Sequence, residues 1–273
     1  MSQQITIDGI VSSAVVAGLE YWRVPRFWLE SARHTPLTRG GLTLPDPAGE
    51  EVRRIRKGDS VTVSMGYRGE DSDAWRAEVT WVRPGTEHQI ELGLVAPDAV
   101  LSRTRYTEAW MHETPEAILR RVLSGAGITP GRIDSPGCEL PRFAVSNENI
   151  WQIAEKLELS CQRAFNIDMR RWALWMDDAG TANWGDFNEP GQASIPGVIT
   201  GGNLIRHAPA TNAAGLSHIE TFLLPFFRHS HQFNLQDAYR GLYGLCRAEK
   251  VRHEIDGHKA RTHIWYGPER GRY

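Results

Sequence analysis

The chain has 273 residues, of which 41% are hydrophobic and 23% are charged, and its formal net charge is -2. This is an ordinary globular composition, and the balanced charge argues against a general affinity for nucleic acid or an acidic membrane surface. The N-terminus lacks the features of a signal peptide, and no window approaches the about 20 apolar residues of a membrane-spanning helix. The cysteines Cys138, Cys161 and Cys246 form no CxxC motif, so we expect free thiols and assembly in a reducing compartment.

The first third of the chain is predicted to form antiparallel β-strands. Residues 61–67 and 75–81 each alternate apolar and polar side chains, with a polar turn at 68–73 between them. This period of two is typical of half-buried strands joined by a hairpin, and residues 90–94 continue the pattern as a third strand. The side chains expected on the buried face of the hairpin are Val61, Val63, Met65, Tyr67, Trp75, Ala77, Val79 and Trp81.

Ten tryptophans are many for a chain of this length, and two of them lie in an aromatic and charged segment near the N-terminus. This segment contains Tyr21, Trp22, Phe27 and Trp28. Large aromatic side chains contribute to cores and also to protein contacts. The sequence therefore leaves two interpretations open, core packing and an exposed contact patch.

The apolar period changes to that of a helix after residue 113. Thr114 is suited to cap the helix, Pro115 to occupy its first position, and Gly125 or Gly127 to end it. A second helix is predicted to begin with Asn147 as its cap. The stripes expected to face the core are Ile118, Leu119, Val122 and Leu123 on the first helix, and Ile150, Trp151, Ala154 and Leu157 on the second.

Residues 161–178 are predicted to form a second hairpin. Its apolar positions are Ala164 and Ile167 before the turn, and Trp172, Leu174 and Met176 after it. Together with the two helices, this hairpin makes a small α+β unit. A segment rich in proline and glycine, 188–203, is expected to connect this unit to a final β region.

The final β region contains the strongest turn signal of the chain, Asp256-Gly257, which suits a two-residue type I′ hairpin. The turn predicts a register in which His253 lies opposite Ala260. It also puts Arg252 opposite Arg261. The outer face then carries a basic strip offset only by Glu254, and its members are Lys250, Arg252, Lys259, Arg261 and His263.

Like charges that lie directly opposite each other destabilise a sheet. We therefore expect acidic groups to cover the basic strip, either from a neighbouring subunit or from the α+β unit. The intramolecular candidates are Asp177, Asp178 and Asp186.

Four histidines offer the only pattern that resembles a metal site: His229, His231, His253 and His258. The first two are two residues apart, so on a strand they would point to the same side, as a zinc site could require. No carboxylate stands at a recognisable ligand spacing, and neither HExxH nor GxSxG is present. The sequence therefore assigns no catalytic, cofactor-binding or metal-binding residue, and a metal-dependent hydrolase built on these histidines is kept as an alternative.

Four blocks in order carry a resemblance to a known family. They are Ile55–Tyr67, Glu113–Ile128, Phe143–Cys161 and the closing hairpin Arg247–Tyr266. In this order they resemble the baseplate hub proteins of tailed phages, which include late control protein D and Mu-like tail hubs and share a fold with the hub part of type VI secretion spikes. Because the chain ends at Tyr273, no lysozyme, peptidase or spike domain is expected.

The resemblance implies a mainly β, α+β fold in which two β-barrel-like units flank a two-helix α+β insertion. The expected units are 1–104, 105–189 and 190–273, the last closed by the 245–266 hairpin. It also implies a non-enzymatic virion structural protein, a homotrimer whose six barrels form a pseudo-sixfold ring between the tail tube and the central spike.

The partners implied are further copies of the chain, the tail tube protein, the spike protein and other baseplate proteins. No cofactor, membrane anchor or sequence-specific binding of nucleic acid is expected, although DNA would pass through the lumen of the ring. The protein would lie in the virion tail baseplate after assembly in the host cytoplasm. A host- or carbohydrate-binding tail module, using exposed tryptophans as stacking platforms, is a further alternative.

Overall fold

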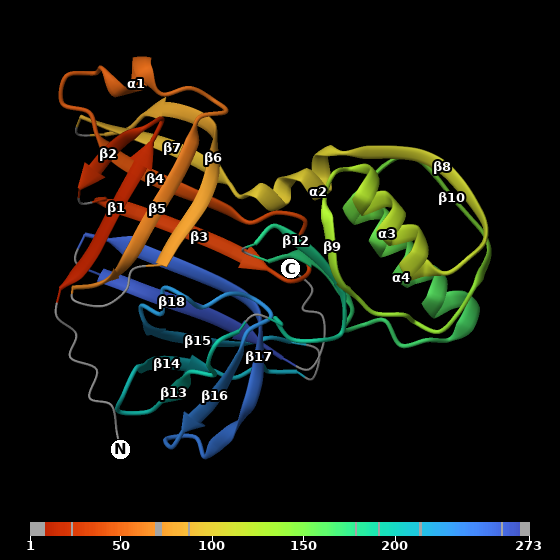
Figure 1. Ribbon diagram of the computed structural model, residues 1–273. Helices are drawn as coiled ribbons and strands as arrows, with labels where there is room; N and C mark the ends of the chain where they lie inside the picture. Colours follow the sequence, from red (N-terminus) through yellow and green to blue (C-terminus); the bar gives the residue numbers. More distant parts are fainter. Residues whose placement is uncertain are drawn as a thin grey trace.

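The computed structural model describes residues 9–22, 24–68, 73–86, 88–177, 179–190, 192–212, 215–257 and 259–267. Its largest feature is a sheet of thirteen strands, beside which a lobe with two helices projects (Figure 1). The strands of this sheet are β1 (Ile10–Val16), β2 (Leu19–Trp22), β3 (Arg26–Ala32), β4 (Arg39–Pro45), β5 (Ser60–Tyr67), β6 (Asp73–Pro84), β7 (Gln89–Val95), β13 (Gly197–Ile199), β14 (Leu204–Ala208), β15 (Ser217–Phe222), β16 (Gln232–Asp237), β17 (Leu242–Asp256) and β18 (Lys259–Tyr266). The predicted mainly β, α+β class is confirmed.

The hydrogen-bonded order along the sheet is β14-β15-β18-β17-β3-β4-β7-β6-β5-β1-β2, and β16 and β13 continue from β17. Strands β2 and β14 are the two ends of this order, so the described strands form an open sheet rather than a closed ring. The antiparallel pairing of β3 with β17 joins the first and last thirds of the chain, with Phe27 opposite Ile255 and Glu30 opposite Arg252.

The predicted hairpin is β5 paired with β6, and its apolar face is buried at Val61, Val63 and Met65. Trp81 was expected on the same face, and this prediction is wrong. The register of β6 against β7 shifts between Val79 and Trp81, and the extra residue of such a bulge reverses the alternation beyond it. Trp81 is consequently 44% exposed, and Val82 packs against the core instead.

The exposed ring of Trp81 lies on a glycine of the neighbouring strand. A Cβ atom placed on Gly93 would meet Nε1 of Trp81 at 2.1 Å, so a larger residue would displace the ring. Trp28 covers Gly41 in the same way on β4, where a Cβ would meet its Nε1 at 2.4 Å. The aromatic segment near the N-terminus is divided between core and surface, because Phe27 is fully buried while Trp22 is 73% exposed.

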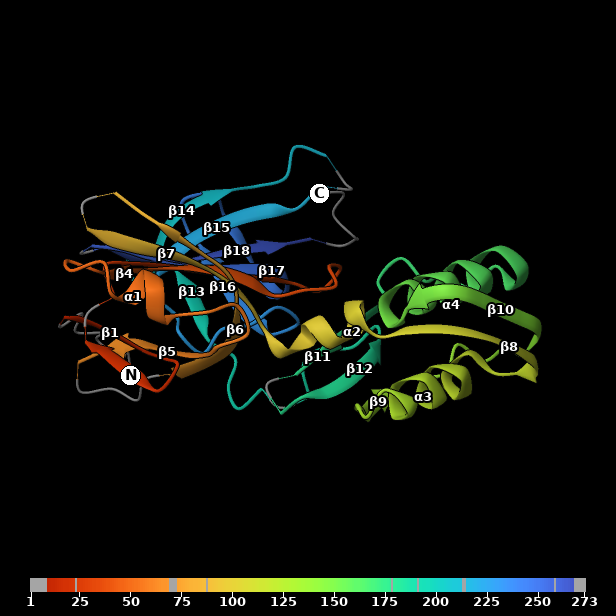
Figure 2. The same ribbon diagram turned by 90° about the horizontal axis from the view of Figure 1, so that it is seen from above.

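The lobe consists of two helices, a two-stranded ribbon and a three-stranded sheet, and it lies to one side of the large sheet (Figure 2). Its helices are α3 (Pro115–Gly125) and α4 (Ile150–Phe165), and its strands are β8 (Arg105–Glu113), β9 (Thr129–Ile133), β10 (Leu140–Asn149), β11 (Ala173–Met176) and β12 (Thr181–Gly185). The short helix α1 (Glu51–Arg54) lies outside it, whereas α2 (Val100–Arg103) contributes Leu101 to the core of the lobe and leads into β8. No described helix is long and apolar enough to cross a membrane.

Helix α3 begins as predicted, because Thr114 is its cap and accepts a hydrogen bond from the amide of Ala117 at 3.4 Å. The predicted cap of α4, Asn147, is wrong. Asn149 caps this helix instead, as part of a capping box. Its side-chain oxygen accepts from the amide of Gln152, and the side-chain oxygen of Gln152 accepts from the amide of Asn149. Asn147 lies in β10 with a positive φ of 55°.

The predicted hairpin at 161–178 is wrong in its first arm. Cys161 is fully buried in α4, because it continues the apolar stripe of Ala154 and Leu157. The helix ends at Asn166, which adopts the left-handed conformation with φ 55°. The second arm does form as β11, but it pairs with β12 further along the chain.

The two asparagines at the start of α4 provide a direct test of the cap. Asn149→Ala is expected to lower the free energy of unfolding by about 1 kcal/mol, because the helix-end amide of Gln152 loses the side-chain oxygen that accepts from it. Asn147→Gly is expected to be neutral or stabilising, since glycine adopts a positive φ without strain. Urea unfolding of both variants measures this difference. Equal losses would contradict the assignment of the cap.

Candidate functional site

The closing hairpin pairs β17 with β18 in a register shifted by two residues from the predicted one. His253 lies opposite Thr262 rather than Ala260, and Arg252 lies opposite His263 rather than Arg261. The last pair of this register is Asp256 with Lys259, so the turn is not centred on Asp256-Gly257. A shift of two leaves each side chain on its predicted face. The predicted opposition of Arg252 to Arg261 is wrong.

The basic strip is covered by acidic residues of its own sheet. Lys250 Nζ lies 2.9 Å from Glu30 Oε2, and Arg252 Nε lies 3.3 Å from Glu254 Oε2. Arg261 pairs with Glu220 at 3.5 Å.

The two described acidic candidates from the α+β unit, Asp177 and Asp186, have other partners than the strip. Asp177 accepts hydrogen bonds within its own turn, and Asp186 pairs with Arg171 and Arg247. Asp178 lies outside the described residues.

These pairs change what a charge reversal is expected to do. In the double variant Arg252→Glu, Arg261→Glu, the new carboxylates would face Glu30, Glu254 and Glu220, so the free energy of unfolding should fall by about 1–2 kcal/mol. The loss should shrink in high salt because these groups are partly exposed. Thermal unfolding at low and high salt tests this. A fall that does not depend on salt would show that packing, not charge, is responsible.

The histidines of the alternative metal site are held by the protein itself. His253 is buried, with one ring nitrogen 3.0 Å from Thr262 Oγ1 and the other 2.8 Å from the carbonyl oxygen of Phe227. His229 is buried with Nδ1 3.0 Å from Ser230 Oγ. His231 stacks edge-on against Phe227.

His258 lies outside the described residues. Among the residues that the structure does describe, no group of three or more His, Cys, Asp or Glu side chains is placed to hold a metal ion.

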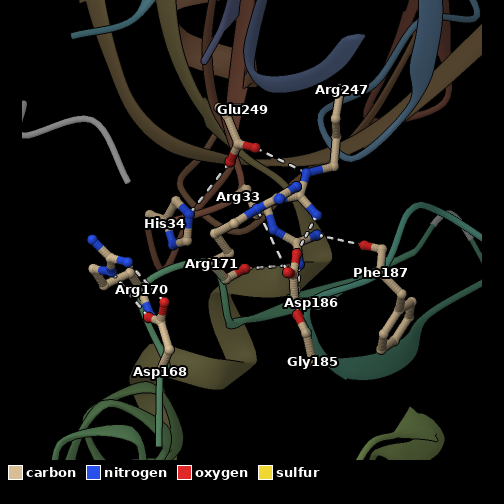
Figure 3. A network of polar contacts seen from close by, with 10 residues as sticks. All are labelled: Arg33, His34, Asp168, Arg170, Arg171, Gly185, Asp186, Phe187, Arg247 and Glu249. Carbon is tan, nitrogen blue, oxygen red and sulfur yellow. Dashed lines mark hydrogen bonds and ion pairs between the residues drawn. The ribbon is translucent and has the colours of Figure 1, made fainter. Parts of the chain in front are cut away.

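A network of charged side chains, most of them buried, joins the lobe to the large sheet (Figure 3). Arg33 follows β3 and is fully buried, and its guanidinium donates to the carbonyl oxygens of Gly185 at 2.5 Å and Phe187 at 3.0 Å. It also donates to Ser230 Oγ at 2.8 Å and lies 4.2 Å from the ring centre of Trp175. One side chain from the first third of the chain thus binds the segment in which the lobe returns to the sheet.

Arg247 and Glu249 of β17 complete this network from the last third of the chain. Arg247 donates from Nε to Glu249 Oε1 at 2.9 Å and from Nη1 to Asp186 Oδ1 at 2.7 Å. Nε2 of His34 lies 3.3 Å from the second oxygen of Glu249. We call Arg33, His34, Asp186, Arg247 and Glu249 the junction network.

Burial shifts the pKa values of charged groups in the junction network. Burial lowers the pKa of Arg33 to about 9, which leaves the guanidinium charged at neutral pH. Burial also opposes ionisation of Glu249, but His34 and Arg247 outweigh it and hold the pKa of this carboxyl below its ordinary value. Arg33 and Glu249 are therefore charged groups held by hydrogen bonds and ion pairs away from water, while Asp186 lies at the exposed edge of the network. Buried charges with partners of this kind suit a rigid joint.

Sequence reasoning missed the junction network, although one signal for it was present. Glu249 shares its inward-facing alternation with Val251, His253 and Ile255. A carboxylate on a buried strand face requires a buried cation, which points to the arginines of the chain. The pairing of β3 with β17 decides which arginine lies close to Glu249.

A cavity of about 540 Å³ lies beside the junction network. It is lined on one side by Trp75, Arg228 and His231 and on the other by Asp177 and Glu189. The guanidinium of Arg228 lies 3.3 Å from the ring centre of Trp75, and Trp175 donates to Glu189 at 2.9 Å. The charged groups of the wall thus already have partners within the chain.

The hairpin of β16 and β17 carries exposed apolar side chains, and it extends beyond the rest of the sheet at the bottom of Figure 1. Residues 241–246 contain no charge, and Tyr243 and Leu245 are 66% and 58% exposed. Leu242–Arg247 pairs with β16 along one edge, and no described strand pairs with its other edge. Free strand edges are surfaces on which proteins associate.

The exposed tryptophans do not form a cluster in the described part of the chain. Trp22 on β2 and Trp81 on β6 are separated by β1 and β5, a span of about 14 Å across the sheet. Trp75, Trp110, Trp151, Trp175 and Trp184 are buried. The stacking platform required by a carbohydrate-binding module is not formed by these residues.

Comparison with solved structures relates the whole chain to tail proteins. A tail protein from Neisseria meningitidis MC58 is 11% identical, with a TM-score of 0.68 over 95% of this chain and 97% of that chain. The 43 kDa tail protein of prophage MuSo2 from Shewanella oneidensis is 12% identical, with a TM-score of 0.65 over 94% and 96%. No protein-family model and no curated protein matches the sequence.

A third solved structure connects this fold to secretion machinery. It is an Escherichia coli component of the type VI secretion system, described as structurally similar to the T4 bacteriophage tail proteins gp27 and gp5. It is 12% identical, with a TM-score of 0.61 over 95% of this chain and 78% of that chain. The chain therefore has the fold of phage and prophage tail proteins, a fold that it shares with this secretion component.

Proposed function

We propose that this chain is a structural protein of a phage or prophage-like tail and forms the hub of its baseplate. Three copies would build a pseudo-sixfold ring that joins the tail tube to the central spike. The observation that carries the proposal is the likeness to the Neisseria tail protein, which extends over 95% of this chain and 97% of that one. The protein would work in the virion baseplate after assembly in the host cytoplasm, and its role would be mechanical rather than catalytic.

The junction network supports this mechanical role. A hub passes force between a tube and a spike, so its lobes must not rotate against one another. Arg33 ties the end of the lobe to the sheet through buried hydrogen bonds, and Arg247 adds a second tie through Asp186. Two separate contacts restrict rotation better than one.

We also propose three units, 1–104, 105–189 and 190–273. In support, the lobe has an apolar core of its own that runs from Leu101 to Trp184. The outer two units are less separate, because Leu223, Ile255 and Ala260 belong to the core of the first unit. Strands β3 and β17 make them one sheet.

Contacts between neighbouring copies would use the exposed hairpin of β16 and β17. We expect Leu245→Asp to reduce assembly at least tenfold, because it buries a charge in an apolar contact, while the melting temperature of the monomer stays within about 2 °C. Ile195→Asp, at another exposed apolar position, serves as the matched control. The distribution of masses by light scattering measures the effect. Equal assembly of both variants would exclude this hairpin as the contact.

Location in the particle tests the proposal itself. The chain would be tagged in the phage or prophage that encodes it, and released tails would be purified and labelled with gold. The label should lie at the end of the tail that carries the spike, and quantitative mass spectrometry should find three copies per tail. Complete tails that lack the chain would overturn the proposal.

A further inference from the structure

Two cysteines of the lobe, Cys138 and Cys161, lie side by side although 23 positions separate them in the sequence. Cys138 Sγ is 3.6 Å from Cys161 Sγ, with both thiols free. Cys161 is fully buried on α4, whereas Cys138 is only partly buried in the loop before β10. The third cysteine, Cys246, lies on β17 in the other part of the molecule.

The loop that carries Cys138 is anchored through Ser135. Ser135 Oγ donates to Glu116 Oε1 of α3 at 2.8 Å and accepts from the amide of Gly137 at 3.2 Å. Gly137 has a φ of 77°, which turns the chain directly before Cys138. Because α4 is fixed by the core of the lobe, the meeting of the two sulfur atoms is built into the fold.

We propose that Cys138 and Cys161 are a disulfide site, which stays reduced in a reducing compartment and closes when the protein meets an oxidising one. The oxidant is a small-molecule disulfide such as oxidised glutathione. The thiolate of Cys138 attacks it, forming a mixed disulfide and releasing one glutathione thiolate. The thiolate of Cys161 then attacks the sulfur of Cys138 and displaces the second glutathione. Two protein thiols are oxidised, one external disulfide is reduced, and the two protons pass to the leaving thiolates.

The order of these steps follows from accessibility. Cys138 is the sulfur that an external disulfide can reach, and Cys161 is shielded by the core. Burial raises the pKa of Cys161 to about 12, so little thiolate is present and the second step should be the slow one. Cys138 is thus the attacking residue and Cys161 the resolving one.

Closure would link the loop before β10 to the last turns of α4. It encloses β10 and most of α4 in a covalent loop, which restricts the unfolded chain and stabilises the lobe. The chemistry depends on the lobe alone and not on the proposed function. If the chain is a tail hub, closure would follow release of the particle from the reducing host cytoplasm.

The test uses the full-length protein, reduced and then incubated with oxidised glutathione. Free thiols are counted after denaturation, and the bridge is located by peptide mass mapping. We expect the count to fall from three to one, with Cys246 still reduced, and the melting temperature to rise by about 5 °C or more. Three remaining thiols, a glutathione adduct left on Cys138, or a bridge to Cys246 would each overturn the proposal, as would an unchanged melting temperature.

Two variants separate the steps. Cys161→Ser should trap glutathione on Cys138, and Cys138→Ser should leave Cys161 reduced. Cys246→Ser is the matched control and should form the bridge at the rate of the unaltered protein. If Cys161→Ser does not fold, Cys138→Ser still decides the case, because uptake of glutathione by Cys161 in this variant would contradict the assigned order.

Discussion

Replacing Arg33 with methionine is expected to lower the free energy of unfolding by about 3–5 kcal/mol. Methionine fills a similar apolar volume, so the loss would come from the polar contacts rather than from a cavity. The carbonyl oxygens of Gly185 and Phe187 and the hydroxyl of Ser230 would lose their buried donor. Glu249 would also lose a nearby positive charge that helps to keep it ionised.

Urea unfolding of the full chain measures this loss, and Arg83→Met is its matched control. Arg83 also pairs with a carboxylate and lies 4.9 Å from the ring centre of Trp81, but its side chain is largely exposed. The control should change stability by less than about 1 kcal/mol. Similar losses for the two variants would show that the junction network does not hold the lobe to the sheet.

Acidification from pH 7 to pH 5 is expected to destabilise the protein through two buried histidines. Burial is the main cause that lowers the pKa of His229 and of His253 to about 3, and the nearby Arg33 and Arg228 add to it. The folded state therefore keeps both rings neutral, whereas the unfolded chain takes up protons below the ordinary value of 6.5. Stability is complete above pH 6.5 and is lost as the pH falls toward 3, by about 2 kcal/mol for each histidine at pH 5.

The variant His253→Gln isolates one of these contributions. Glutamine can still donate to the carbonyl of Phe227 and accept from Thr262, but it does not take up a proton. The fall in stability between pH 7 and pH 5 should become smaller by about 2 kcal/mol. His112→Gln, at an exposed position, is the control. Unfolding curves at the two pH values decide this, and an unchanged difference for His253→Gln would contradict the prediction.

One carboxyl acts in the opposite direction. Burial raises the pKa of Asp98 to about 6, so the folded state takes up this proton before the unfolded chain does. The contribution of Asp98 to the free energy of unfolding therefore rises as the pH falls below 6. Asp98 therefore offsets part of the destabilisation that His229 and His253 cause on acidification. Comparing each variant with the unaltered protein removes this contribution.

The sequence predicted correctly those elements that are determined by interactions between residues close together in the chain. Thr114 and Pro115 mark the start of α3 because a cap and a first-turn proline act within four residues. The alternation at 61–67 placed Val61, Val63 and Met65 in the core for the same reason. Where two local signals competed, as at Asn147 and Asn149, the reciprocal hydrogen bond of Gln152 decided the outcome.

The errors occur where distant segments decide the structure. The register of β17 depends on β3 as well as on the turn, and the bulge at Trp81 depends on Gly93 of the neighbouring strand. The junction network needs residues about 150 and 200 positions apart, as the bonds from Arg33 to Phe187 and Ser230 show. No pattern within a single segment contains this information.

Sedimentation velocity of the full-length protein tests the central claim most directly. A tail hub of the proposed kind should sediment as a species of three times 30.7 kDa, with a fraction that grows as the concentration rises. Mixing with the tail tube and spike proteins of the phage or prophage that encodes the chain should shift the remaining monomer into larger complexes. A monomer of 30.7 kDa at every concentration, both alone and in the presence of these two proteins, would contradict the account.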